Sequence, residues 1–257
     1  MRILLTNDDG YFAEGLTKLA LALCNEHDVV VSAPATEKSG AGHSLTFNRS
    51  LHFNTIGEDE LLLLSESGVA VPVHAVHGSP ADAVKFALEH IYADKPFDLV
   101  ISGVNSVLNI GTDIIYSGTF GAAEEGSVLG VKSIAVSAVA KRGGYDLAIE
   151  FVKNNLPKLV ESIPPFVTLN VNVPCGFREE IKGVRAVPLG LRRYNDWYER
   201  DGKGGYELFG APLDCSDCEK DTDCKMSDLS YITLTPVPVF TTDEEALKAY
   251  AAKEWKL

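Results

Sequence analysis

The sequence predicts an α/β fold, with a Rossmann-like, mostly parallel sheet flanked by helices and a C-terminal β-hairpin/helix extension for oligomerisation. Short apolar runs rich in β-branched residues alternate with amphipathic helical segments up to about residue 175. The first strand, helix and second strand fit within about 30 residues, which is the length of a βαβ unit and implies parallel strands. Beyond residue 175 the alternation ends, and Gly-rich turns separate aromatic segments.

Each buried strand is predicted from a short apolar run bounded by polar or turn residues. These runs cover 3–5, 28–33, 97–103, 131–137, 166–174 and 231–236. Shorter apolar pieces within 45–76 predict further strands and hairpins. Residues 184–189 predict one more strand, and 192–209 predict an extended hairpin. The acidic stretch 214–225 is expected to be an exposed loop.

Five helices are predicted, two of them from their apolar faces and one from the small residues after Thr119. The faces comprise Leu16, Leu19, Ala20 and Leu23 in the first helix, and Leu147, Phe151 and Leu159 in the helix over 146–160. Another helix should begin after Ser79, because a Ser N-cap, Pro80 and Asp82 form a helix-start pattern. We therefore interpret Asp82 as a helix-start residue and not as a catalytic one. The last helix is predicted to begin after Thr242 and Asp243.

Composition excludes several classes of function. The net charge of −13 argues against binding of duplex nucleic acid or a membrane surface, both of which need basic patches. Because no signal-peptide pattern and no membrane-spanning apolar run occurs, we expect a cytoplasmic protein. Five cysteines without a signal peptide argue against a disulfide framework. Cys24 and Cys175 are expected to be buried thiols, and the cluster Cys215, Cys218 and Cys224 is interpreted as part of a solvent loop rather than a zinc or redox site.

The most informative segment is Asn7-Asp8-Asp9-Gly10, which directly follows the first strand. Ligands of open α/β sheets bind beyond the carboxyl ends of the strands. Two adjacent carboxylates repel each other, and a cation between or beside them removes that repulsion. Asp8 and Asp9 are therefore predicted to hold a divalent metal.

Two further strands end in polar loops that should lie at the same edge. The loop after the second strand carries Ser39 and Gly40, and is either a flexible loop or an anion-binding one. Asn105 follows the strand over 97–103, and Ser117-Gly118-Thr119 precedes a helix of small residues. That tripeptide is either an ordinary helix cap or an anion site at a helix N-terminus. An all-oxygen ligand set suits Mg²⁺, Mn²⁺ or Ca²⁺ and argues against zinc.

Several longer motifs resemble the SurE (survival protein E) family of 5′/3′-nucleotidases. They occur in the family's order and span nearly the whole chain: Leu5-Thr6-Asn7-Asp8-Asp9-Gly10, Ser39-Gly40-Ala41-Gly42-His43-Ser44-Leu45-Thr46, Gly78-Ser79-Pro80-Ala81-Asp82, Ser102-Gly103-Val104-Asn105 and Tyr116-Ser117-Gly118-Thr119-Phe120-Gly121. Two positions depart from the family pattern, with Val107 where Gly is more frequent and Ala83 where Cys is frequent.

The resemblance implies a metal-dependent phosphomonoesterase that hydrolyses nucleoside 5′- and 3′-monophosphates. It implies Asp8, Asp9, Ser39 and Asn105 as metal ligands, and Ser117, Gly118 and Thr119 near the phosphate, with Asn7 and Gly40 also expected there. It further implies one SurE-like domain over 1–257. In that domain a Rossmann-like core (1–175) carries an extension (176–257) whose protruding hairpin and swapped helix form a homodimer or homotetramer.

Two rival functions remain open from the sequence. An aspartyl-phosphate phosphatase would use an Asp nucleophile at the end of the first strand, although such sites separate their two Asp by one residue. A non-catalytic nucleotide-binding module could use the same sheet edge. Within the favoured mechanism, Asp8 or Asp9 could also act as general base, and the sequence does not separate that role from metal ligation.

Overall fold

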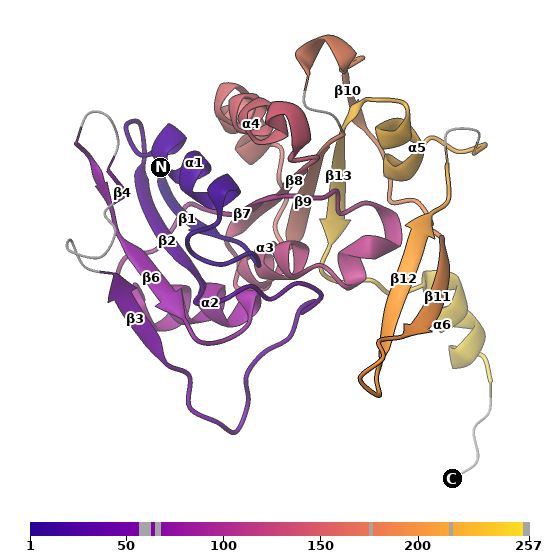
Figure 1. The fold of residues 1–257 in the computed structure, drawn as a ribbon, viewed down its shortest axis with the longest axis horizontal. Helices are drawn as coiled ribbons and strands as arrows, with labels where there is room; N and C mark the ends of the chain where they lie inside the picture. The colour runs from indigo at the N-terminus through magenta and orange to yellow at the C-terminus, as the bar shows by residue number, and fades with distance from the viewer. Residues whose placement is uncertain (57–62, 65–67, 175–176, 216–217, 254–257) are drawn as a thin grey trace.

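The protein is described by a computed structural model covering residues 1–56, 63–64, 68–174, 177–215 and 218–253. Within these residues one nine-stranded sheet forms the centre of the fold (Figure 1). Its strands, in spatial order, are β10 (Val184–Ala186), β13 (Ile232–Pro238), β9 (Val167–Val173), β8 (Lys132–Ala138), β7 (Leu99–Asn105), β1 (Arg2–Thr6), β2 (Asp28–Pro34), β6 (Val73–Val76) and β3 (Phe53–Ile56). The predicted α/β fold with a mostly parallel sheet is confirmed.

The strand order creates a switch point beside β1. The chain runs from β1 outward through β2 to β6, and then returns to the other side of β1 to form β7, β8 and β9 in turn. All of these neighbours are parallel, whereas β3 and β13 pair antiparallel at the two flanks. Because connections diverge from β1 and β7 in opposite directions, their carboxyl ends border the crevice where such sheets bind ligands.

Helices cover both faces of the sheet (Figure 1). α1 (Glu14–Leu23) and α4 (Gly144–Glu161) pack on one face, and α2 (Pro80–Phe86) and α3 (Gly118–Val128) pack on the other. The predicted apolar face of α1 is confirmed, because Leu16, Leu19, Ala20 and Leu23 are all fully buried. The core therefore consists of two layers of side chains, one on each side of the buried strands.

The predicted apolar face of α4 packs against the core, but the buried face is broader than predicted. Leu147 and Phe151 are only half-buried, although Leu159 is buried as expected. The buried stripe comprises Ala148, Ile149, Val152, Leu156 and Leu159. Residues beyond the predicted face are also buried because α4 packs against both α1 and the sheet, and small residues such as Ala148 permit the close approach.

α2 begins as the sequence predicts. The Ser79 hydroxyl accepts a hydrogen bond from the Asp82 backbone N–H at 3.0 Å, and the Asp82 carboxylate accepts one from the Ser79 backbone N–H at 2.8 Å. This is a reciprocal capping box. The Asp82 carboxylate also accepts two hydrogen bonds from Thr46, from its backbone N–H at 2.8 Å and its hydroxyl at 2.6 Å. Asp82 therefore fastens the loop after β2 to the helix in addition to capping it.

Strand β7 is shifted along the chain relative to the prediction, because it covers Leu99–Asn105 rather than 97–103. The sequence places its end at Gly103, but the strand continues to Asn105, with an irregular register against β8 between Ser102 and Asn105. Gly103 permits this path, because a Cβ there would lie 2.2 Å from the Val136 carbonyl oxygen. Asn105 thus sits on the strand itself rather than in the following loop.

The C-terminal part adds two strands to the sheet and projects a hairpin and a helix from it (Figure 1). The predicted hairpin is formed by β11 (Tyr194–Arg200) and β12 (Tyr206–Pro212), and both strands are exposed throughout. The last helix, α6 (Glu244–Ala251), is capped by Asp243 and buries no residue. A separate two-stranded ribbon pairs β4 (Leu63–Leu64) with β5 (Ala70–Val71).

The prediction of an exposed loop over 214–225 is right for residues 214 and 218–221, which are exposed, and wrong for the buried part of the segment. This segment leads into α5 (Asp223–Asp228), and Asp223 is fully buried. Cys215 and Cys224 are also buried and pack against Ile110. Cys218 alone of the cluster is exposed, Cys24 is buried as predicted, and Cys175 lies outside the described residues.

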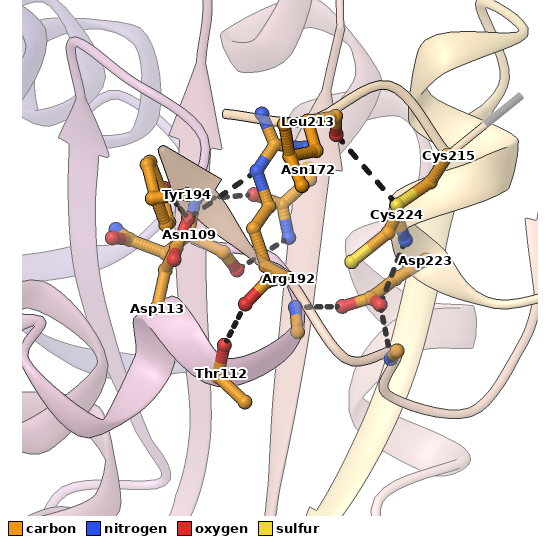
Figure 2. A network of polar contacts seen from close by, with 12 residues as sticks. Asn109, Thr112, Asp113, Asn172, Arg192, Tyr194, Leu213, Cys215, Asp223 and Cys224 are labelled. Carbon is orange, nitrogen blue, oxygen red and sulfur yellow. Dashed lines mark hydrogen bonds and ion pairs between the residues drawn. The ribbon is translucent and has the colours of Figure 1, made fainter. Parts of the chain in front are cut away.

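Buried polar groups explain why this segment folds inward (Figure 2). The Asp223 carboxylate accepts hydrogen bonds from the backbone N–H groups of Gly111 and Gly190, each at 2.7 Å. Asn172 and Asn170, on β9, bind the backbone of Asn109. Buried backbone groups need such partners, so these side chains fix the path of the loop between β7 and α3.

No helix in the described part of the chain is long and apolar enough to cross a membrane. The cytoplasmic location stays a prediction.

We expect Asp82→Ala to lower the free energy of unfolding by about 2 kcal/mol, because it removes a helix cap and leaves the backbone N–H groups of Ser79 and Thr46 without their acceptor. Burial raises the pKa of Asp82, but hydrogen bonds from Thr46 and Ser79 outweigh it and the net pKa lies below the usual value. The stabilisation of the folded state by ionised Asp82 is therefore present above the unfolded pKa of 3.8 and is lost as the pH falls below it.

Urea unfolding at pH 7 and at low pH measures this difference. Asp146→Ala is the control, because Asp146 makes an exposed ion pair with Lys18 that should contribute about 0.5 kcal/mol or less. Equal unfolding midpoints for the Asp82 and Asp146 variants at pH 7 would show that the Asp82 cap contributes no more to the free energy of unfolding than an exposed ion pair does.

Candidate functional site

The loop after β1 is shaped by Asn7. Its side-chain nitrogen donates to the Gly10 carbonyl at 2.9 Å, and its side-chain oxygen accepts from the Gly10 backbone N–H at 3.1 Å. Asn7 is fully buried, and Gly10 has a φ of 105°, which favours glycine. Both polar groups of Asn7 therefore act within the loop, and they fix the turn that presents Asp8 and Asp9.

Asp8 is a buried carboxylate at the end of β1, with 6% of its surface exposed. Its Oδ1 accepts a hydrogen bond from the Thr119 hydroxyl at 2.5 Å, and the Thr119 backbone N–H also donates to the carboxylate. Burial raises the pKa of Asp8, and the hydrogen bonds from Thr119 oppose that shift. The N-terminus of α3 thus holds the carboxylate with donors and with its helix dipole.

The approach between α3 and Asp8 requires glycine at position 118. A Cβ on Gly118 would lie 2.8 Å from Asp8 Cβ and 2.9 Å from Asp8 Oδ2. Ser117 acts as the N-cap of α3, because its hydroxyl oxygen accepts from the Phe120 backbone N–H at 2.9 Å. Of the two interpretations of Ser117-Gly118-Thr119, the cap is observed directly, and the anion held at this terminus is Asp8 itself.

Asp9 is half-buried and lies in a strongly negative environment. Burial, and then the negative charges of Asp8 and Glu37, raise the pKa of Asp9 to about 6. Among the described residues no ion pair neutralises Asp8, Asp9 or Glu37. This uncompensated charge is the electrostatic signature of a cation site.

The loop after β2 passes beside Asp8. The Lys38 backbone N–H donates to the Asp8 carbonyl at 2.7 Å, which fixes the next residue, Ser39, near the carboxylates. The exposed Ser39 hydroxyl donates to Glu37 Oε1 at 2.6 Å. Gly40 is exposed at the tip of the loop, has a φ of 74° and has open space around it.

Asn105 reaches the site from the neighbouring strand. It is buried at the end of β7, which pairs with β1 through Thr6 and Ser102. Its side-chain nitrogen donates to the Val107 carbonyl at 2.8 Å, which leaves the side-chain oxygen as the available ligand atom. The Val107 side chain is 62% exposed, so its presence in place of the family's frequent Gly meets no steric obstacle.

The structure therefore joins Asp8, Thr119 and the loop carrying Ser39 by direct contacts, and places Asn105 on the adjacent strand. Sequence reasoning missed Glu37, whose charge acts on both carboxylates, and Tyr145 of α4, whose pKa is raised by burial and then by the charge of Asp9. An acidic residue two positions before Ser39 was the available signal for Glu37. No local pattern marks Tyr145, because it arrives from a distant helix.

The donor set is suited to a hard divalent cation. It consists of two carboxylates, one amide oxygen and one hydroxyl, without a thiolate or imidazole. The described residues contain no group of three or more His, Cys, Asp or Glu side chains placed to hold a metal. A cation here would therefore depend on the Asp8–Asp9 pair together with neutral oxygens, and the residues present are compatible with that.

Comparison with known proteins identifies the family to which this chain belongs. A family model described as survival protein SurE matches residues 3–196. Proteins named 5′-nucleotidase SurE from Thermosipho melanesiensis and Fervidobacterium nodosum are 39% identical over 254 residues and 41% identical over 256 residues, and each alignment covers 96% of this chain and 95% of the relative. The crystal structure of the Sure protein from Aquifex aeolicus matches with a TM-score of 0.79 at 33% identity, and the match covers 98% of this chain and 100% of that one. This chain belongs to the SurE family.

Proposed function

We propose that this chain is a metal-dependent phosphomonoesterase that hydrolyses nucleoside 5′- and 3′-monophosphates to nucleoside and phosphate. The relatives named 5′-nucleotidase support a nucleotide substrate, and the SurE nucleotidases are generally metal-dependent. The observation that carries the proposal is the Asp8–Asp9 pair, which forms no ion pair with a basic side chain among the described residues, at the switch point of the sheet.

The proposed ligands are Asp8, Asp9, Ser39 and Asn105, and the proposed metal is Mg²⁺ or Mn²⁺, with Ca²⁺ able to bind the same oxygens. When bound, the cation supplies a Lewis acid for a phosphoryl oxygen and lowers the pKa of a water. Thr119 orients Asp8, and Asn7 holds the turn that carries both carboxylates. These contacts fix the ligand oxygens before the substrate arrives, which lowers the reorganisation required during reaction.

The phosphate is proposed to lie against the start of α3. This helix N-terminus lies beside Asp8, and helix N-termini favour anions. The Ser117 hydroxyl accepts from the helix and still has its own proton to donate. Gly40, exposed at the tip of the facing loop, permits close approach of its backbone. Asp8 or Asp9 is proposed to take a proton from an attacking water.

Two rival functions are separated from this proposal by direct measurements. Trapping of a phospho-enzyme on Asp8 or Asp9 would support an aspartyl-phosphate mechanism. Binding of mononucleotides without release of phosphate, in the presence of either metal, would support a non-catalytic binding module.

We expect Asp8→Asn and Asp9→Asn each to reduce kcat/KM by about 10²- to 10⁴-fold, because each removes one of two charged ligands. Calorimetric titration with Mn²⁺ should show weakened binding in both variants. Glu14→Gln is the control, because Glu14 is an acidic residue at the start of α1 whose ion pair with Lys18 is exposed. Full activity in either Asn variant would remove that carboxylate from the mechanism.

Removal of divalent metal with a chelator should abolish phosphate release from nucleoside monophosphates, and added Mg²⁺ or Mn²⁺ should restore it. A panel of 5′- and 3′-monophosphates, with a sugar phosphate as comparison, would establish which base and position are preferred. Undiminished activity after complete chelation would contradict the proposed metal dependence.

We also propose that the hairpin and α6 exchange contacts between subunits of a homodimer or homotetramer. Support comes from exposed apolar side chains on both elements. Clusters of apolar side chains are unfavourable in contact with water and often mark protein–protein interfaces. The exposed side chains are Trp197, Tyr198, Leu208 and Phe209 on the hairpin, and Leu247 and Tyr250 on α6. Both elements project away from the sheet (Figure 1).

The double variant Leu247→Ser/Tyr250→Ser should shift the mass measured by light scattering toward the monomer, since it removes the apolar side of α6. Lys248→Ser, on the exposed surface of the same helix, should leave the mass unchanged. The same oligomeric mass for the double variant and the wild type, compared at equal concentration, would count against a role for α6 in assembly.

A further inference from the structure

We propose that His43 is a positioning residue. As a cation bridged between Glu124 and Glu125, it holds the loop 35–46 against α3 and thereby keeps Ser39 beside the Asp8–Asp9 pair. This inference rests on the proposed function, because Ser39 acts as a ligand only in that proposal.

The bridge uses both ring nitrogens of His43. Nδ1 lies 2.8 Å from Glu124 Oε2, and Nε2 lies 2.7 Å from Glu125 Oε2. The Glu125 side chain is 3% exposed, so the His43 ring reaches a carboxylate that is almost entirely removed from water. Because both nitrogens are engaged, His43 has no free ring atom for the substrate, and its effect must pass through the loop.

The loop follows α3 at backbone distance on either side of this bridge. The Gly42 backbone N–H donates to the Tyr116 carbonyl at 3.1 Å. A Cβ on Gly121 of α3 would lie 2.8 Å from the Gly42 carbonyl oxygen and 2.8 Å from His43 Cα, so glycine is required for the contact. The Ser44 carbonyl then accepts from the Ser79 hydroxyl at 2.5 Å. Ser39, in contrast, is exposed and bonds only to Glu37 within its own loop among the described contacts.

The charges around the bridge favour a protonated His43. The groups that face it are Glu124 and Glu125 on α3 and, from α2, Lys85, whose Nζ lies 3.0 Å from Glu125 and 3.4 Å from Glu89. Three carboxylates therefore surround one lysine and one histidine. Hydrogen bonds to Glu124 and Glu125 raise the pKa of His43 to about 9.

The sign of the pH dependence follows from this direction. A histidine whose pKa is higher in the folded state stabilises that state. The stabilisation is fully present below the unfolded pKa of 6.5 and is lost as the pH rises through about 9. Deprotonation would leave Glu124 and Glu125 with one fewer positive charge between them. The loop is then expected to loosen, and Ser39 to lose its fixed position.

The test measures kcat, KM and the metal activation constant for a nucleoside 5′-monophosphate from pH 6 to pH 10, with Mn²⁺. Wild-type KM should rise above about pH 9. His43→Asn should raise KM or the metal activation constant about tenfold at pH 7, with kcat at saturation nearly unchanged. His43→Arg keeps a permanent cation and should retain the low KM at pH 10. Glu89→Gln, at the edge of the same cluster, is the matched control and should behave as wild type.

A second measurement does not depend on activity. Amide hydrogen exchange of metal-free protein at pH 7 should be faster across the peptide containing residues 38–46 in His43→Asn than in wild type, with helix α4 unchanged. If no mononucleotide is hydrolysed by the wild type with either metal, the proposed function fails while the exchange measurement still tests the bridge.

Three outcomes would overturn the positioning role. The first is a His43→Asn variant with wild-type KM and wild-type exchange. The second is a loss confined to kcat, which would indicate direct participation in the reaction. The third is a uniform loss of thermal stability with no change in exchange of the loop relative to α4, which would make His43 a general structural residue.

Discussion

The burial of the Asp8 carboxylate is the constraint on which the site depends. A buried anion is strongly unfavourable unless donors and positive charge compensate it. Thr119 supplies a hydroxyl and a backbone N–H, and α3 supplies its positive dipole end. This compensation requires α3 to begin against β1, which explains why Gly118 lacks a side chain. The nearby Asp9 and Glu37 charges remain unbalanced, and a divalent cation is what would balance them.

Hydrogen bonds and ion pairs of polar side chains also fix the surrounding loops. The loop between β7 and α3 is tied to β9 through Asn109 and to the C-terminal segment through Asp223 (Figure 2). The loop after β2 is tied to α2 through Asp82 and to α3 through His43. These ties give partners to the buried polar residues Asn109, Asp82, Glu125 and Asp223. Rigid helices and strands thus position the candidate ligands Asp8, Asp9 and Ser39, which stand on loops, next to Asn105 at the end of β7.

The sequence predicted elements whose signal is local. The apolar face of α1 and the cap at Ser79 appear in the structure as expected, because hydrophobic period and capping chemistry act within a few residues. The extent of β7 and the inward fold of Asp223 were mispredicted. The first depends on pairing with β8, and the second depends on backbone N–H groups of Gly111 and Gly190, which are distant in sequence.

By itself the sequence determined the α/β fold, the family resemblance and the candidate ligand residues, because βαβ patterning and long motifs in order are local properties of the chain. Only the tertiary structure decided that Thr119 binds Asp8, that Asn7 serves its own turn, and that Glu37 and Tyr145 border Asp9. These contacts join residues from separate elements, and burial sets their electrostatic effect. Neither the packing of α3 against β1 nor the degree of burial can be deduced from residue order alone.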